Sequence, residues 1–471
     1  MCPDTRRPLP GVFIGAGCKA CHGSCRRVAM MYTAVVATVV FITFIATLFI
    51  CAFLGIPMLY AILAGLVLFL LFGIHQGLPA RRLFAVMVPG FRNSMIVVVV
   101  LFLIGVMSAS WRSSGLMALL VIKGLSLIYP PLFLLFVFLL CSLFSFFLGS
   151  SLGSASVMGV LLSTLGNAAR VDPLITAGAI LSGVYFGDRA SYLSSSALLV
   201  ATINRVDHKR HVRNMLRSSI VPFAASAGIY AVLSGFHTFD ASHAAGVSEL
   251  AGFFSLDTPV LWLPLAIVLL PALTKLKLRS AIVASSAAAI AIAILVQRVE
   301  PSLAVRDIVL GFRRPLDHPQ LSLLYGGGIV SMVKPMLIVF FSGALPPLFT
   351  ELGVLVPYQN FLGKLASITT PFVSALASGI LTCAVGCSQT LAIFLQVPLL
   401  DKVYPGGANE RKAQAIGSTS ILISALVPWN IAMAAPLAII GGSYMSGPYA
   451  FFLYLLPLFT LVYEGLDARH P

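Results

Sequence analysis

Four short stretches rich in glycine, serine and other polar residues interrupt long apolar runs, and chemistry is expected there. They are residues 149–154, 187–191, 386–390 and 428–430. Irregular backbone at membrane depth is tolerated only where it is buried in protein or lines a cavity, and such breaks are typical of transporter binding sites. Asp188 is the acid most plainly embedded between apolar stretches, and a charge there is costly unless it is paired or functional.

The polar residues near Asp188 supply the oxygen atoms that a hard cation prefers. We expect Asp188, Ser191, Ser194 and Asn430 to bind sodium, or Asp188 to carry a proton. Two structural alternatives remain open at this point. Asp188 would form an ion pair with Arg189, and the glycines and serines would only let helices approach each other closely.

Further residues in or near these breaks would contact a small solute. Half-helix N-termini around Ser154 and Ser388 favour anionic groups because the positive end of the helix dipole lies there. Lys334 would neutralise an anion or replace a sodium ion if it faced the centre, although a lysine in an apolar helix more often extends to the membrane interface. The candidate solute-binding residues are Ser154, Lys334, Ser388, Gln389, Thr390 and Trp429.

The elements that position these residues must be membrane helices. Hydrophobic residues make up 59% of the chain and charged residues 10%, which is too apolar for a water-soluble core. The apolar runs far exceed the roughly 10 residues of a transmembrane strand. We therefore predict an all-α polytopic membrane protein with about 11–14 crossings. The runs cover 31–54, 57–74, 94–109, 114–148, 173–202, 217–236, 259–274, 280–297, 328–349, 365–398, 413–442 and 449–463.

The second half of the chain repeats the rhythm of the first. Residues 31, 95, 153 and 188 have counterparts at 259, 330, 386 and 430. We predict two inverted repeats, with broken or re-entrant helices at the midplane, as in secondary transporters. The expected parts are a basic N-terminal tail without fixed structure at 1–29, membrane repeats at 30–236 and 259–471, and an external linker at 237–258.

The net charge of +15 is interpreted as topology rather than nucleic-acid binding. Basic clusters at 6–27, 81–92 and 205–217 should face the cytoplasm, whereas 237–258 contains no Lys or Arg and should face outward. The N-terminus is then cytoplasmic, in the inner (plasma) membrane. The basic segment 298–314 fits this topology only as an interfacial amphipathic helix, or else the topology is wrong by one crossing.

A cysteine and histidine cluster precedes the first apolar run. Cys18, Cys21, His22 and Cys25 have spacing that could bind zinc, but no second ligand group of matching spacing lies nearby. An unstructured tail is the alternative that we prefer.

The segments around Asp188 resemble the NhaC-type sodium/proton antiporters of the ion transporter superfamily. Residues 178–204, GAILSGVYFGDRASYLSSSALLVATIN, are similar to that family's signature, in which a G-D-basic motif precedes S-P-L-S-D-T-T. A second likeness is SALVPWN at 424–430, and the order of segments agrees across nearly the whole chain after Met30. The residues that match the signature are Gly187, Asp188, Ser191, Leu193 and Ser194.

The chain also departs from this signature. Ser195 stands where the family has its second acid, and Tyr192 replaces the proline. Losing an acid removes a candidate cation ligand. The two threonines become Ser196 and Ala197, and Ile431 to Met433 replace small polar residues.

We expect a secondary active transporter that exchanges sodium for protons at Asp188. The alternative, which the wider family also implies, is an ion-coupled transporter of organic acids or amino acids. The chain has no H-E-x-x-H motif, and no Ser or Cys has an evident base at membrane depth, so an enzyme is not expected. No cofactor is expected beyond sodium or a proton as the coupling or transported ion. The expected partners are the lipid bilayer and a small ion or organic solute, and the sequence is compatible with a homodimer.

Overall fold

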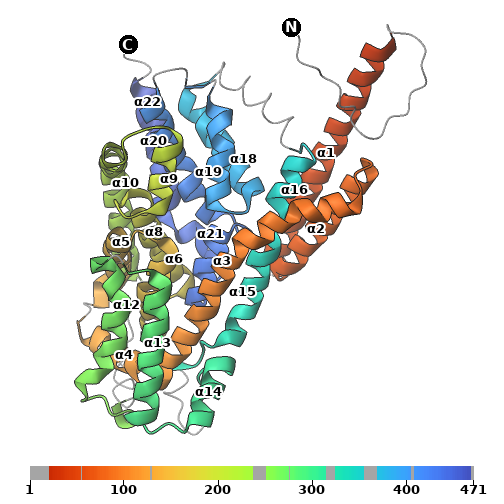
Figure 1. Ribbon diagram of the computed structural model, residues 1–471. Helices are drawn as coiled ribbons and strands as arrows, with labels where there is room; N and C mark the ends of the chain where they lie inside the picture. The colour runs from red at the N-terminus through yellow and green to blue at the C-terminus, as the bar shows by residue number, and fades with distance from the viewer. Residues whose placement is uncertain are drawn as a thin grey trace.

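The protein is an assembly of helices, as the sequence predicts (Figure 1). The computed structural model describes residues 21–54, 56–127, 130–236, 251–274, 276–313, 324–354, 369–401, 403–404 and 408–467. Within these ranges there is no β-strand, and a single antiparallel bridge joins Phe312 to Gly326. Most of the predicted external linker and the first 20 residues lie outside the described residues. The same holds for Cys18 and for the side chains of Cys21, His22 and Cys25.

The first half contains these helices in chain order. They are α1 (Cys21–Phe53), α2 (Met58–His75), α3 (Ala80–Ser113), α4 (Leu116–Leu127), the short η1 (Pro130–Leu132), α5 (Phe133–Leu148), α6 (Ser151–Ser154), the π-helix η2 (Ala155–Gly159), α7 (Val160–Ala168), α8 (Pro173–Ala190), α9 (Ser195–Ile203) and α10 (His208–Phe236).

The second half continues with a similar series. It contains η4 (Pro259–Trp262), α12 (Leu263–Leu273), α13 (Leu278–Leu295), α14 (Pro301–Leu310), α15 (Ile329–Ser342), α16 (Leu345–Glu351), α18 (Pro371–Gly386), α19 (Gln389–Leu400), α20 (Asn409–Ile423), η6 (Ser424–Leu426), α21 (Ile431–Ile440), η7 (Tyr444–Tyr449) and α22 (Phe451–Asp467). A short helix, α14, therefore occupies the basic segment that the sequence assigned to the membrane interface.

Several helices are long and apolar enough to cross a membrane. Among the described residues, α2, α3, α10, α13 and the segment Ile329–Glu351 each qualify by length and composition. A sixth span arises if Asn409–Leu426 and Ile431–Ile440, which meet at 51°, are counted together. Among the described residues six further apolar segments are shorter, at 10–17 residues, and the count of about 11–14 crossings stays a prediction.

The two halves pack against each other in a reciprocal way. Helix α3 contacts α13, and α15 contacts α2; α10 contacts α20, and α22 contacts α8. The pairs α3 with α15 and α10 with α22 join helices that the predicted repeat makes equivalent, and Figure 1 shows α3 and α15 side by side. This pattern is compatible with an internal repeat, which stays a prediction. The inverted orientation of the two halves stays a prediction.

The backbone at two of the breaks has the same conformation in both halves. Helix α5 ends at Gly149 with φ 65°, and α18 ends at Cys387 with φ 50°, both in the left-handed region. The serine that follows is extended in each case, with φ −148° at Ser150 and −149° at Ser388. Each serine is the N-cap of the next helix, which is the usual role of this residue type. The left-handed conformation is tolerated by glycine but strained for Cys387.

The other two breaks share a cap position. Ser194 and Asn430 are both extended N-caps, with φ −70° before α9 and −77° before α21. By cap position Asn430 therefore matches Ser194 rather than Asp188, while the repeat itself stays a prediction.

The ends of α5 and α8 touch through their backbones. A Cβ atom on Gly187 would lie 2.2 Å from the carbonyl carbon of Ser145, and one on Gly149 would lie 2.4 Å from that of Leu193. No side chain fits at either position. These glycines therefore bring the break after α5 against the break after α8.

We predict that Gly187→Ala destabilises the protein by roughly 1–3 kcal/mol or more, because the new methyl group overlaps backbone atoms that cannot move aside. The check is the thermal unfolding temperature of detergent-solubilised protein. Gly228→Ala is the matched control, since nothing lies within 4 Å of its added Cβ and alanine favours a helix by up to about 1 kcal/mol. Equal unfolding temperatures for the two variants would contradict the contact.

Candidate functional site

Asp188 lies in the last turn of α8 and is only 3% exposed. Its Oδ2 accepts hydrogen bonds from Gln389 Nε2 at 2.9 Å and from Ser196 Oγ at 3.1 Å. Its Oδ1 lies 3.5 Å from Ser194 Oγ, and the backbone N–H of Ser151 also donates to the carboxylate. Groups from α6, from the start of α9 and from α19 therefore surround one buried acid. Buried charges require such partners because they have lost their water.

The groups around Asp188 come from the first turns of three helices. Ser150 caps α6 by accepting the Gly153 N–H at 3.2 Å, and Ser388 caps α19 by accepting the Leu391 N–H at 3.3 Å. Ser194 caps α9 and accepts two N–H groups at 3.1 Å. Helix N-termini carry partial positive charge, so their convergence stabilises a negative group between them.

Two predicted cation ligands have other hydrogen-bond partners. Ser191 donates to the Phe146 carbonyl oxygen and accepts the Leu193 N–H at 3.1 Å, which fixes the end of α8 to α5. Asn430 caps α21 through Oδ1, and its Nδ2 donates to the Cys383 carbonyl oxygen at 2.9 Å. Among the hydrogen bonds of the described residues, none joins Asn430 to Asp188. Asn430 nevertheless adjoins the site, because the next N–H, that of Ile431, donates to the Cys387 carbonyl at 2.9 Å.

Of the six candidate solute-binding residues, Gln389 contacts Asp188 directly. Ser388 belongs to the site as the cap of α19, and Thr390 is exposed beside it. Ser154 is buried and donates to the Ser150 carbonyl at 2.8 Å. The structure thus brings the break at 386–390 to the acid.

The other two candidates lie away from the carboxylate. Trp429 is buried and donates to the Ala384 carbonyl at 2.8 Å, with its ring edge-to-face with Phe49 at a centroid distance of 5.4 Å. Lys334 lies on an exposed face of α15.

The proposed ion pair between Asp188 and Arg189 does not form. The Arg189 guanidinium donates its hydrogen bonds to oxygens of α10 and α20 instead. Consecutive residues at the end of a helix project in different directions, and here the acid and the base have separate sets of partners.

Three further residues of the site were not predicted from the sequence. Ser196 donates to both carboxylate oxygens, and its position two residues after a helix cap could have indicated this. Ser151 contributes through its backbone N–H, for which no sequence signal exists. Tyr185 lies one turn before Asp188 and donates to the Ala432 carbonyl, which joins α8 to the start of α21.

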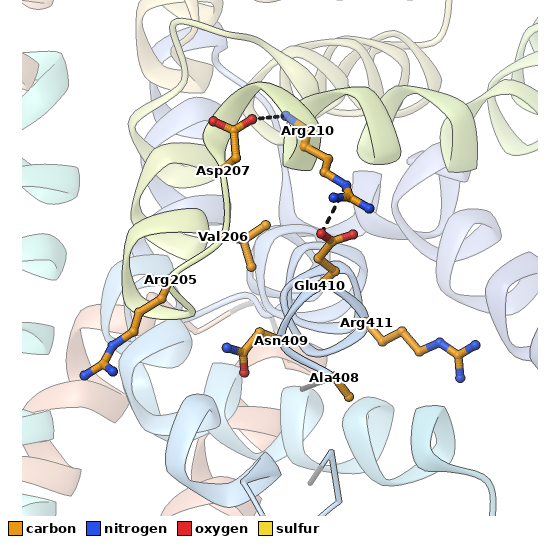
Figure 2. A pocket seen from close by; sticks show the side chains of 8 residues that line it. All are labelled: Arg205, Val206, Asp207, Arg210, Ala408, Asn409, Glu410 and Arg411. Atoms are coloured by element: carbon orange, nitrogen blue, oxygen red, sulfur yellow. Dashed lines mark hydrogen bonds and ion pairs between the residues drawn. The ribbon is translucent and has the colours of Figure 1, made fainter. Parts of the chain in front are cut away.

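A cavity of about 630 Å³ is found elsewhere, at the surface between the turn before α10 and the start of α20. Figure 2 shows Arg210 and Glu410 meeting there in an ion pair of 3.0 Å, while Arg205 and Arg411 extend to opposite sides. None of the predicted site residues lines this cavity. The described part of the chain also holds no group of three or more His, Cys, Asp or Glu residues that could bind a metal ion. Among the described residues, the hydrogen bonds at this site include one carboxylate, that of Asp188, with hydroxyl and amide groups around it.

Comparisons with known proteins agree with a membrane transporter. The sequence profile of the Na+/H+ antiporter family matches residues 183–464, which include Asp188 and the helices α9 and α19 but not α6. The chain is 29% identical to the malate-2H(+)/Na(+)-lactate antiporter of Bacillus subtilis, covering 83% of this chain and 86% of that protein. It is 26% identical to the Na(+)/H(+) antiporter NhaC of Alkalihalophilus pseudofirmus, covering 87% and 90%. It is 28% identical to the arginine/ornithine antiporter ArcD of Halobacterium salinarum, covering 79% and 80%.

We predict that Gln389→Ala lowers the free energy of unfolding by roughly 1.5–3 kcal/mol, because the buried carboxylate loses its amide donor. Thermal unfolding in detergent measures this change. Thr390→Ala is the control, because the neighbouring threonine is exposed and its loss should change stability by less than about 0.5 kcal/mol. If the two variants unfold alike, the hydrogen bond to Asp188 has little energetic weight.

Proposed function

The chain belongs to the Na+/H+ antiporter family, and we propose that it exchanges sodium ions for protons at Asp188. It is a multi-pass membrane protein and a secondary transporter, not an enzyme. The observation that carries the proposal is the buried carboxylate of Asp188, held by hydroxyl and amide groups from several helix starts.

One carboxylate is enough for exchange, because a proton and a sodium ion compete for the same oxygen atoms. Asp188 and the hydroxyl of Ser196 supply up to three oxygens. The Ser194 hydroxyl already accepts two N–H groups and donates to the Asp188 backbone carbonyl, so it holds the end of α8 in place. Gln389 donates an amide N–H to the carboxylate. Turning that amide over presents its oxygen to a cation instead, since the two ends of a glutamine side chain are nearly the same shape. Sodium binding then requires both loss of the carboxyl proton and this turn of the amide.

The cation reaches Asp188 between the first turns of α9 and α19. These two helices contact each other, and exposure rises outward from the buried carboxylate. Ser196 and Gln389 are half-buried, whereas Ser195 and Thr390 are exposed. Movement of one repeat against the other then opens the site to the opposite side, as the broken helices of secondary transporters allow.

We place the protein in the inner (plasma) membrane with a cytoplasmic N-terminus. The basic clusters near 81–92 and 205–217 support this orientation, because Lys and Arg are enriched in cytoplasmic loops.

An organic acid or an amino acid is the second candidate cargo, coupled to the same ion site. Two relatives carry names of antiporters for malate and lactate and for arginine and ornithine. Because Ser195 is neutral, Asp188 is the one acid in contact with these helix starts among the described residues. The partial positive charge of the helix N-termini would then favour the carboxylate of a bound solute. Uptake of labelled lactate, malate or arginine into vesicles separates the candidates, because sodium/proton exchange predicts no organic cargo.

We predict that Asp188→Asn abolishes sodium-dependent proton flux, reducing it to the level of protein-free liposomes. An amide neither carries the exchanged proton nor supplies the charge that binds sodium. The measurement is the pH of the lumen of proteoliposomes, reported by a trapped dye, after sodium or lithium is added.

Asp172→Asn is the matched control at the other end of α8. Asp172 accepts the Leu174 N–H at 2.8 Å as an N-cap, a role that asparagine fills equally well, so exchange should persist. Undiminished exchange by the Asp188 variant would remove the proposed mechanism.

A further inference from the structure

Arg189 is a second buried charge next to the site, and among the described residues it has no carboxylate partner. It is 0% exposed, and all five of its N–H groups are used. Nε donates to the Gly417 carbonyl at 3.0 Å. The remaining bonds are from Nη1 to the Met215 carbonyl at 2.8 Å and Ser219 Oγ at 2.6 Å, and from Nη2 to Ser218 Oγ at 2.9 Å and Ser418 Oγ at 3.0 Å.

These bonds satisfy the hydrogen-bonding capacity of the guanidinium but not its charge. All five acceptors are neutral oxygens on α10 and α20, and no acid is among the partners of Arg189 in the described part of the chain. Removing a charge from water without a counter-charge costs free energy. If Arg189 only linked α8 to α10 and α20, a neutral side chain could do so with a smaller loss of stability. The retained charge therefore calls for an electrostatic explanation.

The acid next to it in sequence is Asp188, on the other side of α8. The carboxylate faces α9 and α19, and the guanidinium faces α10 and α20. The two groups do not touch, yet charges on adjacent residues in a dry interior interact appreciably because no water screens them. With the cation site empty, the two charges sum to zero. With a proton or sodium ion bound to Asp188, Arg189 leaves a net charge of one.

We propose that Arg189 is a positioning residue whose fixed positive charge weakens cation binding at Asp188, so that a bound cation is released after each transport step. This inference rests on the proposed function. The guanidinium is held by two helices and does not move toward the carboxylate, which prevents it from taking the place of the cation. Its five bonds also keep the end of α8, and with it Asp188, fixed to α10 and α20.

Two variants test whether the positive charge of Arg189 weakens sodium binding. In Arg189→Gln the charge is lost, and we expect the sodium concentration for half-maximal exchange to fall about tenfold, with slower maximal turnover because release is slower. In Ser218→Asp a carboxylate is placed where the Ser218 hydroxyl accepts from Nη2, which neutralises Arg189 while its other bonds remain. The same fall in half-maximal sodium concentration is expected, although the two variants should differ in stability.

Two further variants serve as matched controls. Arg189→Lys keeps the charge but loses the planar fork of donors, so it should unfold at a lower temperature while its half-maximal sodium concentration stays within about twofold of the wild type. Arg112, a second buried arginine, lies at the end of α3 and donates to the Ser108 carbonyl at 2.8 Å. Arg112→Gln should leave the half-maximal sodium concentration unchanged.

Each full-length variant is measured in two ways. One is sodium-dependent proton flux in proteoliposomes. The other is the sodium concentration that raises the unfolding temperature of the purified protein, which reports binding without transport. The inference is overturned if Arg189→Gln and Ser218→Asp keep the wild-type sodium dependence, or if Arg189→Lys changes it as much as Arg189→Gln does. A wild-type protein that neither binds nor exchanges sodium contradicts the proposed function itself, which is a separate outcome.

Discussion

A negative charge buried among apolar helices must find donors within the protein, and this constraint governs the structure around Asp188. An unbroken helix bundle offers few such donors, because its backbone N–H groups are already paired. Here the helices are interrupted, and each new helix start has backbone N–H groups in its first turn that are not paired within the helix. Ser150, Ser194 and Ser388 cap three of these turns, and Ser151, Ser196 and Gln389 then reach the carboxylate.

The same constraint explains the close backbone contacts. For the start of α6 to approach Asp188, the break after α5 must touch the break after α8, and this is possible only with glycine at residues 149 and 187. The broken helices therefore depend on one another. A change in the position of one of them would alter the donors around the carboxylate, which is how binding of a small ion can be coupled to a larger movement.

The site joins the two halves of the chain. Ser194 and Ser196 come from the first half, and Gln389 comes from the second. Two side chains of α8 reach the second half as well: Arg189 donates to a carbonyl of α20, and Tyr185 donates to the Ala432 carbonyl in α21. Because α8 contacts helices of both halves on each of its sides, a change at its acid would reach both halves of the chain. The reciprocal contacts of α3 with α15 and α10 with α22 support the same two-part organisation.

The sequence by itself determined the helical membrane class, the four breaks and the embedded position of Asp188. These follow from local properties, because apolar runs, interrupting glycines and a lone embedded acid are visible along one dimension. Only the tertiary structure decided which residues of these breaks contact Asp188. Asn430 and Ser191 have other partners, Ser196 and the Ser151 N–H contact the carboxylate, and Arg189 turns away from it. Those pairings depend on how distant helix ends approach each other, a property that spacing along the chain does not encode.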